Sequence, residues 1–357
     1  MTDIVVGAGL GGLSVASAMT AAGRSVRVLE AKPRCGGRIK SVPHSPGSVH
    51  AVDLGPTWFW PHQRRVRALC DRLQVGVFEQ HAVGATLYQL APSSIQRAHG
   101  PAPPSFRIEG GTTRLIDALC SALPPETVTC DCRVVQVARS AGLWQLMVQT
   151  DAGRELVSTP TLVIAVPPRV WLGIDGAGAC FSTALNQALA ATPTWMAAQA
   201  RFVATYERAF WREQGLCGDA FSRVGPMAEV HDASASPEAN AALFGFLGVP
   251  APARQGLGEE RLVELCIDQL AALFGEQARN FTATYLKDWA ADRCIATQVD
   301  IAGPHAHPEL DLRPYLAELH RLRCSFASTE AAAEEGGYLE GALAAAEQAS
   351  YALTSRV

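Results

Sequence analysis

The sequence predicts an α/β fold with more than one domain, and three observations carry this prediction. First, the chain has 357 residues, of which 48% are hydrophobic, which is enough for a large core but long for a single unit of usual size. Second, residues 4–6 form a short apolar run, typical of a parallel strand that is buried on both faces. Third, this run leads directly into a glycine-rich turn and a helix-like segment at residues 13–22.

The glycine-rich turn, residues 7–12 (GAGLGG), matches the pattern G-x-G-x-x-G. Gly7 permits a tight strand-to-helix turn, Gly9 lets the backbone approach a pyrophosphate, and Gly12 lets the helix pack closely on the strand. A second apolar run ends in Glu30, whose carboxylate can accept hydrogen bonds from ribose hydroxyl groups and would repel a 2′-phosphate. The segment predicts a Rossmann-type dinucleotide-binding domain, but alone it does not distinguish NAD from FAD.

The triplet Gly36-Gly37-Arg38 follows soon after the second predicted strand. The two glycines allow a close backbone approach, and the Arg38 guanidinium offers a fixed fork of donors that suits a diphosphate. The triplet and its position resemble those of the flavin-containing amine oxidase superfamily, which includes monoamine, polyamine and L-amino acid oxidases. The resemblance implies a short, bacterial-type, monoamine oxidase-like enzyme that binds FAD rather than NAD. Because no local pattern around Cys294 matches a covalent attachment site, the FAD is expected to be non-covalent.

Several segments between the two ends of the chain also resemble motifs of this superfamily. Residues 53–58 (DLGPTW) are similar to a loop that passes close to the flavin ring, and residues 110–119 are similar to a glycine-rich helix start. Residues 162–168 resemble a buried strand that ends in an A-x-P-P turn. The cofactor-binding residues that the resemblance implies in this part of the chain are Gly55, Pro56, Thr57, Trp58 and Val134, of which Val134 lies where the superfamily's backbone meets the adenine.

The C-terminal block, residues 326–342, is the second strong match. In the superfamily such a strand-to-helix element brings the last helix under the flavin. The resemblance implies that Glu330 contacts the ribityl–pyrophosphate region and that Tyr338 and Leu339 lie at the flavin, with Leu339 donating its backbone N–H. The dipole of the following helix would stabilise the reduced, anionic flavin.

Three residues are predicted to take part in the chemistry. Tyr338 matches one of two aromatic rings that flank the substrate nitrogen in amine oxidases, whereas no tyrosine matches the other ring. Trp289 matches a tryptophan that lines the flavin. Arg201 occupies the place of a lysine near flavin N5, although a surface position on a strand is the alternative. Because arginine does not release its proton, reoxidation of the flavin by O₂ is expected to be slow.

Charge and cysteine usage limit the choice of partners. The net charge is −4 and no basic tract is present, so nucleic acids and anionic membranes are not expected as partners. The ten cysteines form no C-x-x-C pair, and the only close pair is Cys130 and Cys132. No metal site is predicted, and the thiols are expected to be buried and reduced in a cytoplasmic protein.

Residues 229–232 (EVHD) either recognise a substrate ammonium or form a solvated turn.

The two terminal matches predict a domain that is discontinuous in sequence. The Rossmann-type FAD-binding domain is expected to comprise residues 1–58, 105–175 and 300–357, and a smaller α+β substrate-binding domain is expected to comprise residues 59–104 and 176–299. The first insert is short for the superfamily, which predicts a more open active site than that of a monoamine oxidase.

The resemblance implies an FAD-dependent oxidoreductase that oxidises a small amine by hydride transfer to flavin N5. Either O₂ or another acceptor would then reoxidise the flavin. Two alternatives stay open, a flavin-dependent desaturase or porphyrinogen-type oxidase and a non-catalytic flavin-binding protein. The protein is expected to be a monomer or a homodimer.

Overall fold

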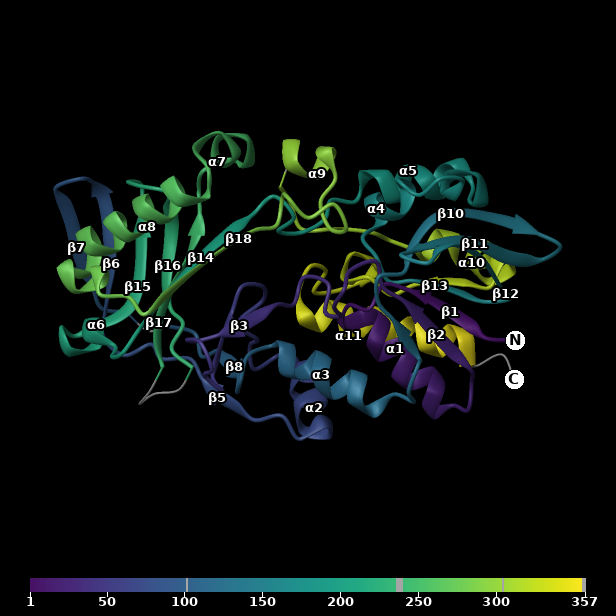
Figure 1. Ribbon diagram of the computed structural model, residues 1–357, viewed down its shortest axis with the longest axis horizontal. Helices are drawn as coiled ribbons and strands as arrows, with labels where there is room; N and C mark the ends of the chain where they lie inside the picture. The colour runs from purple at the N-terminus through teal and green to yellow at the C-terminus, as the bar shows by residue number, and fades with distance from the viewer. Residues whose placement is uncertain (101, 236–239, 304, 355–357) are drawn as a thin grey trace.

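The computed structural model describes residues 1–357 except 101, 236–239, 304 and 355–357 (Figure 1). Two layered parts lie side by side along the long axis of the molecule. One part contains a five-stranded sheet and both ends of the described chain, and the other contains a seven-stranded sheet.

The five-stranded sheet is parallel throughout. Its residues alternate between two cores, since Val5, Val28 and Val163 enter one hydrophobic cluster while Ile4 and Leu29 enter another. Burial on both faces explains why these strands are short, continuous apolar runs in the sequence. The predicted α/β fold is confirmed. The strands, in their order across the sheet, are β19 (Cys324–Phe326), β13 (Leu162–Ile164), β1 (Asp3–Val6), β2 (Val26–Leu29) and β9 (Val128–Thr129).

Each face of the parallel sheet is covered by different elements (Figure 1). Four helices form the first core: α1 (Leu10–Ala21), α2 (Arg64–Leu73), α3 (Thr113–Ala122) and α11 (Leu339–Thr354). The second core joins the sheet to α4 (Pro168–Leu172), α5 (Thr183–Ala191), α10 (Leu316–Leu322) and a three-stranded antiparallel sheet of β10 (Arg133–Ser140), β11 (Leu143–Thr150) and β12 (Gly153–Thr159).

One face of the seven-stranded sheet packs on α8 (Glu259–Phe274). Its strand pairs are antiparallel except for β15 with β6. The hairpin of β3 (Ser41–Pro43) and β4 (Ala51–Asp53) packs on the opposite face. The strands, in their order across the sheet, are β18 (Ala283–Asp288), β14 (Ala200–Tyr206), β17 (Ala241–Leu247), β16 (Met227–Asp232), β15 (Leu216–Ser222), β6 (Ala85–Ala91) and β7 (Ser94–Ala98).

Short elements complete the connections. They are β5 (Val77–Glu79) paired with β8 (Phe106–Ile108), α6 (Phe210–Glu213), α7 (Ala251–Leu257), α9 (Gln298–Ala302) and 3-10 helices at Ala177–Cys180, Glu276–Arg279, Arg313–Tyr315 and Thr329–Ala331. Among the described residues, no helix is long and apolar enough to cross a membrane.

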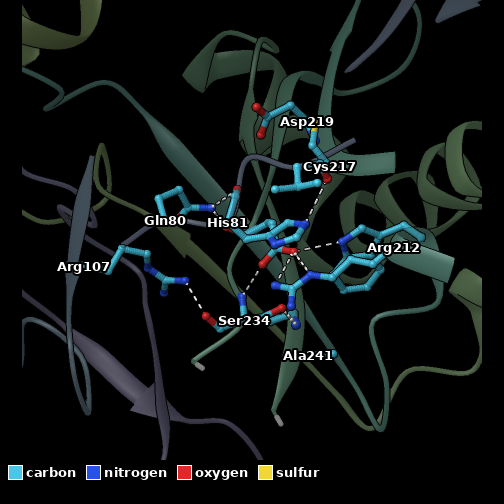
Figure 2. A network of polar contacts seen from close by, with 12 residues as sticks. Gln80, His81, Arg107, Arg212, Cys217, Asp219, Ser234 and Ala241 are labelled. Carbon is cyan, nitrogen blue, oxygen red and sulfur yellow. Dashed lines mark hydrogen bonds and ion pairs between the residues drawn. The ribbon is translucent and has the colours of Figure 1, made fainter. Parts of the chain in front are cut away.

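A buried polar network ties the antiparallel pair of β5 and β8 to the seven-stranded sheet (Figure 2). Its centre is the carboxylate of Asp232, which is 1% exposed and accepts hydrogen bonds from Arg212 Nε at 2.9 Å and the Ser234 backbone N–H at 2.8 Å. Arg107 of β8 donates to the Ser234 carbonyl at 2.7 Å, and Gln80 donates to the Asp232 carbonyl at 2.9 Å. Residues 229–232 therefore end strand β16, and the prediction of a solvated turn there is wrong.

The strands of the two large sheets come from different parts of the sequence. All strands of the parallel sheet fall in the three ranges predicted for the FAD-binding domain, and all strands of the seven-stranded sheet fall in the two predicted inserts. The helix α2 belongs to the first insert but packs in the core of the parallel sheet, where the Val66 N–H donates to Glu340 of α11 at 3.0 Å. The domain boundaries themselves stay a prediction.

Gly11 controls how closely α1 approaches the segment that precedes α11. A Cβ at Gly11 would lie 1.9 Å from the Ala327 carbonyl oxygen, so the helix would have to move. We expect Gly11→Ala to lower the free energy of unfolding by about 1–3 kcal/mol, as overpacking does elsewhere. Urea unfolding measures this change, and Gly9→Ala is the matched control because its Cβ would meet no atom within 4 Å. Equal stability of the two variants would contradict the packing argument.

Candidate active site

A cavity of about 650 Å³ lies where the two large parts of the molecule meet. Its walls include the carboxyl ends of β1 and β2, which is where nucleotide ligands bind in open α/β sheets. All predicted site residues line this cavity except Gly12 and Glu330. The lining residues that the sequence predicted are Gly7, Gly9, Glu30, Gly36, Gly37, Arg38, Gly55, Pro56, Thr57, Trp58, Val134, Arg201, Trp289, Tyr338 and Leu339.

The turn between β1 and α1 is shaped by its glycines. Gly7 has φ of 102°, a conformation that favours glycine, and its N–H donates to the Leu29 carbonyl at 2.8 Å. Gly12 lies behind the cavity wall, where a Cβ would come within 2.0 Å of the Gly7 carbonyl oxygen. The helix begins at Leu10 without a capping side chain or an acidic residue in its first turn. Its first N–H groups therefore remain available for an anion.

Glu30 is a buried carboxylate that its own backbone neighbours hold in place. It is 5% exposed and accepts hydrogen bonds from the Ala8 N–H at 2.8 Å and the Lys32 N–H at 2.9 Å. Each oxygen of a carboxylate has two lone pairs, so Glu30 can still accept hydrogen bonds from hydroxyl groups in the cavity. Its position and orientation fit the recognition of a ribose.

The two glycine-rich segments form one wall of the cavity. The Gly36 N–H donates to the Ala8 carbonyl at 2.7 Å, and a Cβ built on Gly37 would lie 3.5 Å from the Gly9 Cα. The guanidinium of Arg34 donates to the Gly37 carbonyl at 3.0 Å and thereby fixes the second turn. Backbone without side chains thus faces the cavity from both segments, which leaves room for a diphosphate.

Arg38 and Glu330 bind each other rather than acting separately. Their closest ion-pair contact is 2.7 Å, and Arg38 Nη2 donates to the second carboxylate oxygen at 3.0 Å. Arg38 also donates to the Trp195 carbonyl at 3.2 Å. Glu330 is fully buried and reaches the cavity only through Arg38, whose guanidinium it orients. In this structure Glu330 orients Arg38, and its contact with the cofactor stays a prediction.

Arg201 is 4% exposed, so the alternative of a surface position is wrong. Its guanidinium lies over the rings of Phe244 and Phe246, at 4.1 and 4.7 Å from their centroids. Its Nη1 donates to the Asp53 carbonyl at 3.0 Å and to the Thr57 hydroxyl. Burial lowers the pKa of Arg201 to about 9 against the opposing effect of Asp53, and the group remains charged at neutral pH. No described residue accepts a hydrogen bond from its Nε or Nη2.

Asp53 joins the Arg201 side chain to the start of α3. Its Oδ1 accepts hydrogen bonds from the N–H and hydroxyl of Thr112, both at 2.8 Å, and from the Ser41 hydroxyl at 2.6 Å. A Cβ at Gly111 would lie 2.6 Å from the Ser41 hydroxyl oxygen, which explains the glycine at this point of the 110–119 motif. The motif serves the cavity indirectly, by fixing the loop that begins at Asp53.

Aromatic rings form the wall of the cavity near α11. The Tyr338 ring meets the Trp60 ring edge-on, with centroids 5.8 Å apart, and the Tyr338 hydroxyl lies 3.3 Å from His307 Nε2. Sequence reasoning missed Trp60. The sequence pattern that could have predicted it is the alternation of side chains in an extended segment. Phe59 is buried in the core, while its neighbours Trp58 and Trp60 both line the cavity. The structure thus brings a tryptophan, and not a second tyrosine, against Tyr338.

His231 lies behind Trp58, whose ring it meets edge-on at 5.0 Å. Its ring nitrogens lie 3.0 Å from Asp219 and 3.4 Å from Glu229. Burial disfavours the charged ring, but the hydrogen bonds to these two carboxylates outweigh it and raise the pKa of His231. The carboxylates are thus occupied by His231, and the cluster does not line the cavity.

Comparison with known proteins places this chain in a family. A model described as "Flavin containing amine oxidoreductase" matches residues 85–354, and one described as "NAD(P)-binding Rossmann-like domain" matches residues 5–73. The chain belongs to the flavin-containing amine oxidoreductase family. It is a flavin-dependent amine oxidoreductase with FAD as its cofactor, as predicted, and the glycine-lined wall and Glu30 fit that cofactor.

Relatives cover nearly the whole chain. Putrescine oxidase from Kocuria rosea is 25% identical over 458 aligned positions, which span 96% of this chain and 94% of that protein. Amine oxidase [flavin-containing] B from Sus scrofa is 22% identical and covers 97% of this chain and 85% of its own length. The structure of cyclohexylamine oxidase from Brevibacterium oxydans shares the fold with a TM-score of 0.82 at 18% identity, covering 99% and 98% of the two chains.

A substitution at Gly9 tests whether the glycine-lined wall contacts the cofactor. Its Cβ would project into open space beside the cavity and would not disturb the protein. We expect Gly9→Ala to cost about 1–3 kcal/mol of binding by crowding FAD, which is roughly a 5- to 150-fold loss of affinity. Titration of the apoprotein with FAD measures this loss. Unchanged affinity at unchanged stability would show that FAD does not lie against Gly9.

Proposed function

We propose that this chain oxidises small monoamines whose substituent is uncharged and apolar, with FAD held non-covalently. The observation that carries the proposal is the charge inventory of the cavity. Glu30 is the only carboxylate among the described residues that line it, and Glu30 lies at the end of β2, in the position suited to a ribose. The charged residues that line the rest of the cavity are all basic: Lys32, Arg38, Arg133, Arg169, Arg201 and Arg293.

A second ammonium group on the substrate would find no counter-charge in this cavity. The buried guanidinium of Arg201 would repel it, and an unpaired buried charge costs several kcal/mol. A diamine such as putrescine, which gives the Kocuria rosea relative its name, is therefore a poor substrate for this chain. By contrast, the rings of Trp58, Trp60, Phe246 and Tyr338 offer apolar surface to an uncharged substituent.

Arg201 also favours the reactive form of the substrate. A nearby positive charge lowers the pKa of an amine, so the bound nitrogen loses its proton more readily. The free lone pair then stabilises the positive charge that develops on nitrogen as hydride leaves the adjacent carbon. FAD, when bound, supplies the two-electron acceptor for that hydride. The chain itself contributes the desolvated pocket and the fixed cation.

The contacts of Cys294 favour non-covalent FAD. This thiol lines the cavity, but it accepts a hydrogen bond from Arg133 Nη2 at 3.3 Å. Arg133 is adjacent to Val134, the residue proposed to meet the adenine. Cys294 thus lies beside the residue that the resemblance assigns to the adenine, and its sulfur is engaged by Arg133.

A pair of isosteric amines tests the substrate proposal. n-Pentylamine and putrescine have the same number of non-hydrogen atoms but differ by one ammonium group. We expect anaerobic n-pentylamine to bleach the oxidised-flavin absorbance of the holoenzyme, with a kcat/KM about 100-fold or more above that of putrescine, equivalent to ~3 kcal/mol. Equal rates would overturn the charge argument, whereas bleaching by neither these amines nor benzylamine and cyclohexylamine would overturn amine oxidation itself.

Arg201 further predicts that O₂ is a poor acceptor. A lysine ammonium can give up and regain a proton near neutral pH when buried, whereas the Arg201 guanidinium, even with its pKa lowered to about 9, holds its proton at neutral pH. We expect Arg201→Lys to raise the rate of reoxidation by O₂ about tenfold or more, a change of ~1.4 kcal/mol in the barrier. Stopped-flow mixing of the substrate-reduced enzyme with O₂ measures this rate.

A dye acceptor such as dichlorophenolindophenol provides the control for Arg201→Lys. The dye takes electrons without a protein proton donor beside the flavin, so its rate should be alike in both proteins. Fast reoxidation of the wild type by O₂, at the rate of the variant, would contradict the proposed effect of Arg201.

A further inference from the structure

Three cysteines from separate segments meet beside the glycine-lined wall. Cys35 directly precedes Gly36, Cys120 lies on α3, and Cys130 follows β9. The sulfur atoms of Cys35 and Cys130 are 3.9 Å apart, and all three residues are half-buried. The prediction that the thiols are buried is therefore wrong for these three, as it is for Cys180 and Cys294.

The backbone keeps Cys130 next to Cys35 and turns Cys132 away. Asp131 has φ of 52°, and its N–H donates to the Lys32 carbonyl at 3.0 Å. The Cys132 N–H donates to the Glu30 carbonyl at 2.8 Å, while its side chain, 1% exposed, enters the second core. The close pair in the sequence, Cys130 and Cys132, is thus not the close pair of thiols in the structure.

We propose that Cys35, Cys120 and Cys130 form a peroxide-reactive thiol site whose stable product is a Cys35–Cys130 disulfide. Disulfide sulfur atoms lie about 2.05 Å apart, so the two sulfurs must approach by roughly 2 Å. That movement is within reach of a loop residue and a residue at the end of a two-residue strand.

The order of steps follows from the acidity of the thiols. A hydrogen bond from the Cys35 thiol lowers the pKa of Cys120, whereas burial raises the pKa of Cys130 to about 12. The Cys120 thiolate therefore reacts first with the peroxide. The O–O bond breaks, one oxygen stays on sulfur as a sulfenic acid, and the other leaves as hydroxide, which takes up a proton to become water.

The Cys35 thiol then attacks the sulfenic sulfur of Cys120. The S–O bond breaks, water leaves, and a Cys35–Cys120 disulfide forms. Next, the sulfur of Cys130 attacks the sulfur of Cys35 as its proton passes to Cys120, and Cys120 leaves because the more acidic thiol is the better leaving group. In total, two thiols lose two electrons and two protons, and one peroxide is reduced to two waters.

Disulfide formation would shift the glycine-lined wall of the cavity. Cys35 is covalently joined to Gly36, whose N–H bonds the Ala8 carbonyl at 2.7 Å, and the Cys35 carbonyl accepts from Arg34 at 2.9 Å. A shift of Cys35 toward Cys130 pulls on both contacts, so the oxidised protein should hold FAD less tightly. This consequence rests on the proposed contact of Gly36 and Gly37 with the cofactor, whereas the disulfide itself does not.

Thiol mapping of the holoenzyme tests the site without reference to turnover. The protein is treated with hydrogen peroxide, free thiols are blocked with N-ethylmaleimide, and the disulfide-linked peptides are identified by mass spectrometry. We expect a peptide pair that joins Cys35 to Cys130 and is lost on treatment with dithiothreitol. Cys120→Ser should slow its formation, whereas Cys180→Ser, which removes a half-buried thiol bonded to the Gly176 carbonyl, should not.

Absence of any disulfide that contains Cys35, or an unchanged rate in Cys120→Ser, would overturn the proposal. Gel filtration after peroxide treatment measures FAD retention separately. Wild type should lose FAD and Cys130→Ser should retain it. Full retention of FAD by fully oxidised wild type would overturn the proposed effect of the disulfide on the glycine-lined wall. It would not bear on the proposal of amine oxidation.

Discussion

The close approach of the two chain ends governs the architecture of the cavity. Helix α1 can lie against the segment before α11 only because Gly11 has no Cβ, and the turn under it can close only because Gly12 lets the Gly7 carbonyl come near. These contacts place the starts of two helices, from opposite ends of the chain, at one cavity. Since both helix starts carry partial positive charge, an anionic dinucleotide suits the space between them.

Charged groups around the cavity are held by fixed partners. Glu330 orients Arg38, and the Asp53 carbonyl and Thr57 hydroxyl hold one nitrogen of Arg201. Such partners reduce the cost of burying charge and prevent reorganisation when a ligand enters. Arg201 differs from Arg38 in that it lacks a carboxylate partner in the described structure, so its field acts on whatever occupies the cavity.

Local motifs were predictable from the sequence because their function depends on spacing along the chain. The turn at residues 7–12 and the acid at Glu30 form one βαβ unit, and both took their expected places in the parallel sheet. The pairing of Glu330 with Arg38 was not predictable, since it joins residues from opposite ends of the chain through tertiary packing. Cys35 and Cys130 were missed for the same reason. The prediction for residues 229–232 failed because a polar turn and a strand with paired carboxylates have the same sequence pattern. Here Glu229 is paired with His231, and Asp232 accepts hydrogen bonds from Trp211 and Arg212.

The fixed positive charge of Arg201 bears on two proposed properties, the choice of substrate and the choice of electron acceptor. Under the proposed function, this fixed cation over two aromatic rings disfavours a second ammonium and favours the uncharged form of a bound amine. Under the same proposal, Arg201 holds its proton at neutral pH and offers O₂ reduction no readily transferred proton. A lysine at this place would retain the first effect only while protonated and would weaken it whenever it donates. The proposed function therefore couples substrate choice to acceptor choice through one side chain of β14, so that a substitution of Arg201 is expected to change both.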